Sequence, residues 1–415
     1  MTGYRNLHRF AVLTSVVTFF LIIAGGLVTS TESGLSVPDW PNTYGRFMFA
    51  FPPDQMVGGI LYEHSHRLIA SFVGLLTLIL AIWVWRREDR RWVRMLGLAA
   101  ILMVIAQGVL GGLTVLFLLP TAISVSHAML AQTFFILIAS IALFTSPWWR
   151  DEHRVPQEKG VPVVLLSLAA ASAVYVQLVL GALMRHTHSG LAVPDFPFAY
   201  GQIIPSLSPE AVGRYNQYLI ASGIRIAADD PVTSPQIIIH MLHRIWALVV
   251  CIPVVWTSLR LRKYKQLSRL GYALTGLLIV QIALGALAVL TGKSVLMTTA
   301  HVAAGALLLV CAVLAALRAI RLWGIPADGT LSPSRLLSRS LDYLLLTKPE
   351  LTMLSVLTAL CGFYLGTPGP FDFWRFFHVA LGTTLVGGGA GALNQFIERG
   401  YDALMKRTER RPLPA

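Results

Sequence analysis

Long apolar segments are the feature that most constrains how this chain can fold. The first runs from about Phe10 to Val28, and similar stretches recur along all 415 residues. At about 1.5 Å per helical residue, each is long enough to cross a hydrocarbon core of roughly 30 Å. With 55% hydrophobic and 13% charged residues, the composition excludes an ordinary soluble globule. The sequence therefore predicts an all-α polytopic membrane protein.

The net charge of +13 would also fit a nucleic-acid-binding protein, but the positions of the charges indicate another cause. Most of the 33 Lys and Arg residues lie at the N-terminus and in alternate loops between apolar segments, which is the positive-inside pattern. The chain is expected in the cell inner (plasma) membrane, with a cytoplasmic N-terminus and no nucleic acid as partner. The first apolar run is longer than a usual signal-peptide core, so a retained helix is predicted.

The second half of the chain repeats the first. The sequence Ser-Gly-Leu-Ser-Val-Pro-Asp-Trp-Pro at 33–41 reappears as Ser-Gly-Leu-Ala-Val-Pro-Asp-Phe-Pro at 189–197. Each repeat holds four predicted spans, an even number, so the two halves have parallel topology. The sequence predicts two four-helix transmembrane bundles, over residues 1–155 and 156–325, with eight spans in total.

Four histidines occupy equivalent positions in the two halves. Each lies near the outer start of an even-numbered span, on the order of 10 Å below the outer membrane surface. One membrane histidine alone would fit an interhelical hydrogen bond, but four at one depth indicate metal ligands. Two imidazoles from facing helices are what bis-histidine ligation of heme requires. The predicted ligands are His66, His127, His243 and His301.

Charged residues accompany these ligands. Arg67 and Arg244 directly follow a ligand and are expected to pair with heme propionates, interfacial anchoring being the alternative. Glu63 shares a helix face with His66, where the second repeat has His240. A carboxylate there suits proton handling or substrate positioning, although a helix-start acid stabilised by the dipole is the simpler alternative. The first half is therefore predicted to be catalytic, with Glu63 as catalytic residue, and the second to hold an electron-transfer heme.

The outer loops and the remaining histidines carry weaker predictions. The two Ser-Gly-Leu-x-Val-Pro-Asp loops have Gly and Pro at turn positions and are predicted to be lids over the two sites. His64 lies about 200° around the helix from His66, so it cannot serve the same metal and is expected at the membrane interface. His186 and His188 are expected to be solvated residues of the second outer loop.

Residues 1 to about 325 resemble heme A synthase of the proteobacterial and mitochondrial kind. The resemblance implies that the first-half histidines hold the substrate heme O and the second-half pair a heme b cofactor. It also implies oxidation of the C8 methyl of heme O, through successive hydroxylations, to the formyl group of heme A. The electron donor is unknown, membrane lipid is an expected partner, and a homo-oligomer is left open. The motifs that carry the resemblance are the Gly-Leu-Ser-Val-Pro-Asp-Trp-Pro loop, Glu63-x-x-His66-Arg67, His127, His243-Arg244 and His301.

The sequence changes character in its last part. Residues 326–345 are predicted to be a cytoplasmic linker, and 346–415 to contain about two further spans. A helical stripe of oxygen-bearing side chains follows, which suits Mg²⁺ bound to a diphosphate but would also fit a solvated helix end. Lys406 and Arg407 are predicted to hold phosphate oxygens. The stripe consists of Asn394, Glu398 and Asp402.

Residues 346–415 resemble the opening of protoheme IX farnesyltransferase, the heme O synthase that joins heme b to farnesyl diphosphate. The resemblance implies a fusion of consecutive enzymes whose second part is truncated and inactive, and which would use Mg²⁺ only if completed. A heme O synthase, fused to this chain or separate from it, is then an expected partner. Two alternatives remain open: a diheme b-type membrane cytochrome that carries electrons without substrate oxidation, and a transporter with histidines on a proton or metal path.

Overall fold

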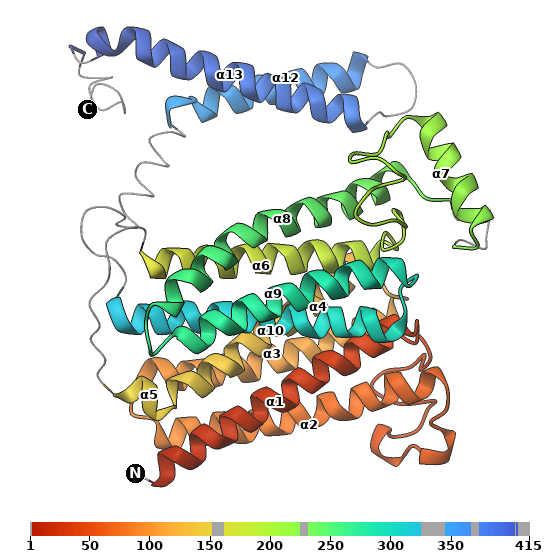
Figure 1. Cartoon of the computed structure of the whole chain (residues 1–415), viewed down its shortest axis with the longest axis vertical. Coiled ribbons are helices and arrows are strands. Elements are labelled where there is room, and N and C mark those ends of the chain that lie inside the picture. Colours follow the sequence, from red (N-terminus) through yellow and green to blue (C-terminus); the bar gives the residue numbers. More distant parts are fainter. Residues whose placement is uncertain are drawn as a thin grey trace. The chain divides into compact units, whose positions relative to one another are not determined.

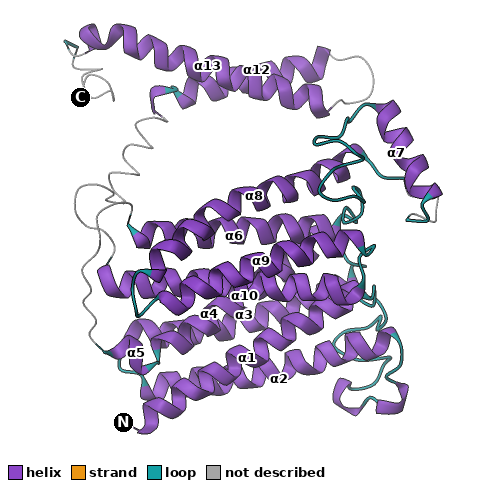
Figure 2. Cartoon of the chain, viewed as in Figure 1, coloured by secondary structure: helices purple, strands orange, loops and turns teal. Residues whose placement is uncertain are grey.

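The computed structural model describes residues 2–151, 162–224, 231–324, 345–366, 373–402 and 404–405. The described chain is helical, and the loops contain two isolated β-bridges but no strand (Figure 2). It divides into two compact units, Met1–Ile325 and Pro326–Ala415. Each unit is described by itself.

The first repeat forms a closed four-helix bundle (Figure 1). Its helices pack in the order α1–α2–α3–α4, and α4 returns to α1. The buried core includes Leu7, Leu80 and Ile138 from three different helices. The helices are α1 (Thr2–Ser30), α2 (Gly59–Arg87), α3 (Arg91–Leu116) and α4 (Thr121–Phe144), followed by the short α5 (Pro147–Arg150).

The second repeat forms a bundle of the same cyclic order, in which α6, α8, α9 and α10 pack in sequence and α10 returns to α6. The predicted architecture of two four-helix bundles is confirmed. An additional short helix, α7, lies in the long loop between α6 and α8 (Figure 1). The bounds are α6 (Val163–His186), α7 (Pro209–Ala221), α8 (Ser234–Arg262), α9 (Ser268–Leu290) and α10 (Val295–Trp323).

The two bundles pack side by side through equivalent helices. Helix α1 contacts α10 of the other bundle, and α6 contacts α4, which is the same contact after exchange of the two repeats. Phe135 and Ala139 of α4 are buried against Ala306 and Val310 of α10 in this interface. The arrangement is that of parallel repeats related by an axis along the bundle direction.

Nine helices among the described residues are long and apolar enough to cross a membrane, namely the eight bundle helices and α13 (Phe373–Asp402). Helix α12 (Pro349–Gly366) is a shorter apolar helix that packs against α13. Large apolar side chains such as Leu102, Leu248 and Ile279 are exposed on the outer faces of the bundles. These features are those of a multi-pass membrane protein, because lipid covers such faces.

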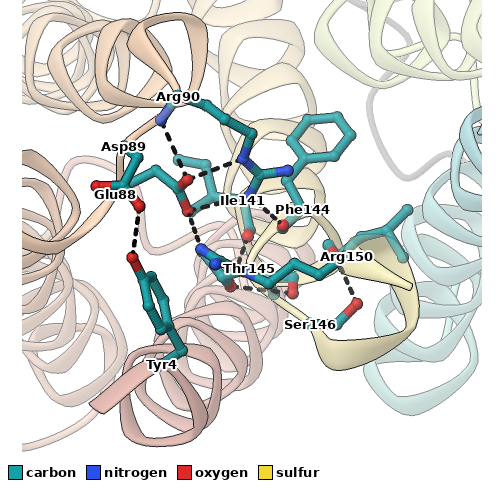
Figure 3. Close-up of polar contacts among 11 residues, drawn as sticks. Tyr4, Glu88, Asp89, Arg90, Ile141, Phe144, Thr145, Ser146 and Arg150 are labelled. Carbon is teal, nitrogen blue, oxygen red and sulfur yellow. Dashed lines mark hydrogen bonds and ion pairs between the residues drawn. The ribbon is translucent and has the colours of Figure 1, made fainter. Parts of the chain in front are cut away.

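The end of the first bundle that carries the N-terminus lies opposite the long loops (Figure 1) and is closed by ion pairs around Glu88 (Figure 3). Its Oε1 accepts from Arg90 Nε at 2.8 Å, and its Oε2 accepts from Arg150 Nη2 at 2.7 Å. Arg90 also donates to the Phe144 carbonyl at the end of α4. Burial alone would raise the pKa of Glu88, but these hydrogen bonds and charges outweigh burial and lower it. The cluster joins the α2–α3 turn to the chain that follows α4.

Candidate functional site

The predicted ligands of α2 and α8 each lie against a glycine of the preceding long helix. A Cβ added at Gly25 of α1 would lie 3.1 Å from His66 Cε1. A Cβ added at Gly181 of α6 would lie 3.1 Å from His243 Cε1. The two glycines occupy equivalent positions in the repeats, so both bundles position this imidazole by the same close approach of two helices.

The predicted ligands of α4 and α10 have the same arrangement. A Cβ added at Gly111 of α3 would lie 3.3 Å from His127 Cε1, and one at Gly285 of α9 would lie 2.9 Å from His301 Cε1. All four ligand rings therefore lie in spaces that any larger residue would fill. None of these glycines was among the site residues predicted from the sequence.

The histidines come together in pairs, one pair in each bundle. The ring centres of His243 and His301 are 6.4 Å apart. With metal–nitrogen bonds of about 2 Å, two imidazoles on opposite sides of one metal have ring centres roughly 6 Å apart. His66 and His127 lie within electrostatic range of each other, and the Nδ1 atom of each is buried without a hydrogen-bond partner among the described residues. The residues present thus fit a heme iron in each bundle.

Two glutamines contact the second pair, Gln281 through its backbone carbonyl and Gln177 through its side-chain amide. His301 Nδ1 lies 3.1 Å from the carbonyl oxygen of Gln281, a contact that places the ring proton on Nδ1 and leaves Nε2 as the ligand atom. The Gln177 amide lies 3.2 Å from both ring nitrogens of His243 and donates to the His243 carbonyl. The position equivalent to Gln177 in the first repeat is Leu21, so this polar support belongs to the second bundle.

Glu63 is buried, 3% exposed, and both of its carboxylate oxygens accept hydrogen bonds. Oε2 accepts from the backbone amide of Val37 at 2.8 Å, and Oε1 accepts from Arg67 at 2.6 Å. His240, the equivalent residue, lies 3.0 Å from the Ser189 carbonyl through its Nδ1. Both residues therefore hold the loop above their bundle, and the catalytic role of Glu63 stays a prediction.

Arg67 and Arg244 bind the two repeated loops in the same way. Each guanidinium donates to three backbone carbonyls at equivalent loop positions, at distances of 2.7 to 3.1 Å. Their predicted pairing with heme propionates stays a prediction. The carbonyls belong to Val37, Asp39 and Asn42 in the first loop and to Val193, Asp195 and Phe198 in the second.

An aspartate closes the tight turn within each loop. Asp39 accepts from the backbone amides of Tyr44 and Gly45, both at 2.8 Å. Burial raises the pKa of Asp39, but these two amides and the nearby Arg67 guanidinium outweigh it and lower the pKa. The turn contains a cis Trp40-Pro41 peptide, and the second loop repeats it with Phe196-Pro197. The second loop closes through Asp195, Tyr200 and Gly201.

The first loop packs directly beside a candidate ligand. The Trp40 ring lies against Gly112 of α3, next to the glycine that contacts His127. This placement supports the prediction that the loop is a lid over the first site. His64 is 1% exposed, and its Nδ1 lies 3.1 Å from Thr43 Oγ1 of the same loop. The expectation that His64 lies at the membrane interface is wrong, because the loop covers it.

His186 is the last residue of α6 and is partly buried. Its carbonyl accepts from Thr121 Oγ1, at the start of α4 in the other bundle, at 3.2 Å. Its imidazole lies within electrostatic range of His127. The expectation that His186 is a solvated loop residue is therefore wrong, because His186 ends a helix that packs on α4.

The predicted diphosphate stripe lies on α13. Asn394 Nδ2 donates to Glu398 Oε2 at 2.8 Å, and Asp402 is the last residue of the same helix. Its binding role stays a prediction. Lys406 and Arg407 lie outside the described residues, as does the predicted linker except for residue 345.

Comparison with known proteins places these sites in context. Residues 8–313 match the family model COX15-CtaA, described as cytochrome oxidase assembly protein. Residues 355–415 match the UbiA prenyltransferase family.

The chain is similar to several proteins named heme A synthase. That of Halalkalibacterium halodurans is 29% identical over 311 residues, covering 72% of this chain and 92% of the relative. That of Shouchella clausii is 34% identical over 217 residues, covering 51% and 69%. That of Rhizorhabdus wittichii is 27% identical over 337 residues, covering 73% and 91%. The chain belongs to the COX15-CtaA family of cytochrome oxidase assembly proteins and carries a UbiA prenyltransferase segment at its C-terminal end.

Proposed function

We propose that this protein is a heme A synthase. The first bundle binds heme O through His66 and His127, and the C8 methyl of that heme is oxidised to the formyl group of heme A. The second bundle holds heme b through His243 and His301 and passes electrons. One observation supports this division most strongly: both bundles provide a glycine-backed histidine pair, but only the first has a carboxylate, Glu63, one turn from its ligand.

The chain's own residues position the substrate and control access to it. Bound heme supplies the redox chemistry. Each loop, tied to its bundle by an arginine, covers the end of the helices and limits entry of water. Glu63 is held in place by Arg67 and the Val37 amide, so its carboxylate is fixed near the ligand for proton transfer or for orientation of the substrate.

The proposed orientation follows from the charge pattern. The protein lies in the inner membrane with its N-terminus in the cytoplasm, and both heme sites lie toward the outer face of that membrane. The long loops, described at 31–58, 187–224 and 231–233, then face outward, together with the ends of the helices that carry the ligands (Figure 1).

Heme A formation distinguishes this proposal from the electron-carrier alternative. The protein is expressed in cells that make heme O but not heme A, and extracted hemes are separated by chromatography. The wild type is expected to yield heme A, and Glu63→Gln to lower that yield at least tenfold while heme b remains bound. A carrier would form no heme A and would be indifferent to this substitution.

The UbiA segment is proposed to bind magnesium diphosphate weakly through Asn394, Glu398 and Asp402. We expect no farnesyl transfer by this chain alone. Incubation of the pure protein with heme b, farnesyl diphosphate and Mg²⁺ tests this expectation. Heme O as a product would refute it.

A further inference from the structure

Arg185 lies at the contact between the two bundles and has no carboxylate partner among the residues that the structure describes. It is the penultimate residue of α6 and is partly buried. Its Nη2 donates to the Gly26 carbonyl and to Ser30 Oγ of α1, both at 2.9 Å. No ion pair between described residues includes it. A guanidinium that is partly removed from water and bound only to neutral acceptors is costly unless an anion joins it.

The contacts of Arg185 place it beside the first bundle. Gly26 directly follows Gly25, the glycine that lies against His66. The next residue of α6, His186, is held by Thr121 at the start of α4 and lies within electrostatic range of His127. The end of α6, a helix of the second bundle, thus reaches α1, whose Gly25 lies against His66, and α4, which carries His127.

Donor capacity remains on Arg185 after these contacts. Both N–H groups of Nη2 have acceptors, whereas Nη1 and Nε donate no hydrogen bond to a described residue. Ser30 is fixed from its other side by Thr299 Oγ1 of α10 at 3.1 Å, which holds the acceptor in place. The guanidinium is therefore preorganised, with one edge bound to α1 and the other edge available to a ligand.

Only one of the two repeats has a cation at this position. The position equivalent to Arg185 in the first half is Thr29, whose hydroxyl donates to the Gly25 carbonyl of its own helix. The second bundle consequently receives no such cation from α1. Arg67 and Arg244, by contrast, are equivalent and are both occupied by loop carbonyls.

We propose that Arg185 binds a carboxylate of the tetrapyrrole held by His66 and His127, so that the second bundle completes the substrate site of the first. This inference rests on the proposed function of that site. A tetrapyrrole of the heme type carries carboxylates at one edge of its ring, and one of these would supply the anion that Arg185 lacks among the described residues. The simpler account, a cation stabilised by the C-terminal dipole of α6, predicts no preference for a charged ligand.

The test compares heme O with its dimethyl ester, in which both carboxylates are neutral and the iron and ring are unchanged. The full-length protein, purified with its second-half heme, is titrated with each probe and followed by absorbance. The wild type is expected to bind the acid about tenfold to a hundredfold more tightly than the ester. Arg185→Gln should weaken binding of the acid by that factor, leave the ester unaffected and retain the second-half heme.

Controls separate the possible failures. Arg214→Gln, which removes an exposed charge from α7, should behave as wild type. Equal binding of acid and ester by the wild type would overturn the assignment of Arg185, even if the variant does not fold. Unchanged binding of the acid by Arg185→Gln would overturn it too. A wild type that binds neither probe would instead overturn the proposed substrate site.

Discussion

Each of the four candidate ligands lies against a glycine of a neighbouring helix, and the imidazole occupies the space that a side chain at that glycine would fill. Because helices at such a contact approach closely, a single methyl group is large compared with the space available. The same holds where Trp40 of the first loop packs on Gly112. Residue-scale predictions can therefore be made with the smallest substitution, Gly to Ala, and matched glycines serve as controls.

Gly285→Ala is expected to displace His301, because the new Cβ would lie 2.9 Å from its Cε1. We predict loss of the second-half heme and overpacking that costs about 1–3 kcal/mol. Gly276→Ala on the same helix has nothing within 4 Å of its added Cβ and should keep both hemes. Heme content per protein, by pyridine hemochrome, is the measurement. Equal heme loss in the two variants would contradict the role of Gly285.

Gly112→Ala is expected to push the Trp40 ring away from α3 and to loosen the first loop. The second repeat has Ala286 and Phe196 at the equivalent positions, a smaller ring opposite a larger helix residue. We therefore predict that Gly112→Ala lowers the free energy of unfolding by about 1–3 kcal/mol, and that adding Trp40→Phe restores part of this loss. Additive losses in the double variant would show that the two residues do not interact.

At the scale of elements, hydrogen bonds from side chains to backbone fix the loops and turns that join the helices. Arg67 and Arg244 each hold a loop through three carbonyls, and Glu88 joins the turn after α2 to Arg150 beyond α4. Removal of one partner leaves the other buried or half-buried without compensation. Such contacts respond to pH where a carboxylate is involved.

The Glu88 cluster gives a stability prediction with a defined sign. Its pKa is lowered in the folded protein, so its contribution is present above the ordinary value of 4.5 and is lost as the pH falls through the folded pKa. Glu88→Gln should cost about 2–4 kcal/mol at pH 7, and the stabilities of wild type and variant should converge as the pH falls from 4.5 through the lowered pKa of Glu88. Asp89→Asn, at the exposed neighbouring position, should change little. A difference in unfolding that does not depend on pH would contradict this account.

The helices could be predicted from sequence because apolar length and an internal repeat determine them almost alone. The four histidines could be found because they recur at equivalent positions. The loop contacts of Arg67 and the burial of His64 could not, since each depends on how a folded loop lies on its helices. Helix α7 was missed because its segment has no counterpart in the first repeat, although Ser208 and Pro209 form a helix start of a recognisable kind.

At the scale of the whole molecule, the proposed function assigns different tasks to two equivalent bundles. Their packing is symmetric, with α1 on α10 and α6 on α4. Their polar residues are not, since Glu63, Arg185 and Gln177 each lack an equivalent in the other half. In the proposed function, this asymmetry separates a reactive site in the first bundle from an electron-transfer site in the second.

The division into two compact units leads to a prediction for truncation. A chain that ends at Ile325 keeps all described residues of the two bundles and the whole region matched by the COX15-CtaA model. We expect it to bind both hemes and to form heme A at a rate within about twofold of the full chain. Loss of heme A formation in a truncated chain that still binds both hemes would show that the UbiA segment takes part in the reaction.

The measurement that tests the central claim most directly is pigment extraction from the wild type, His66→Ala and His243→Ala, each expressed with a heme O supply. The account predicts heme b together with heme O or heme A in the wild type. His66→Ala should lose heme O and heme A but keep heme b, and His243→Ala should lose heme b. Heme b alone in the wild type, with equal losses in the two variants, would contradict the division of the two bundles into a substrate site and a cofactor site.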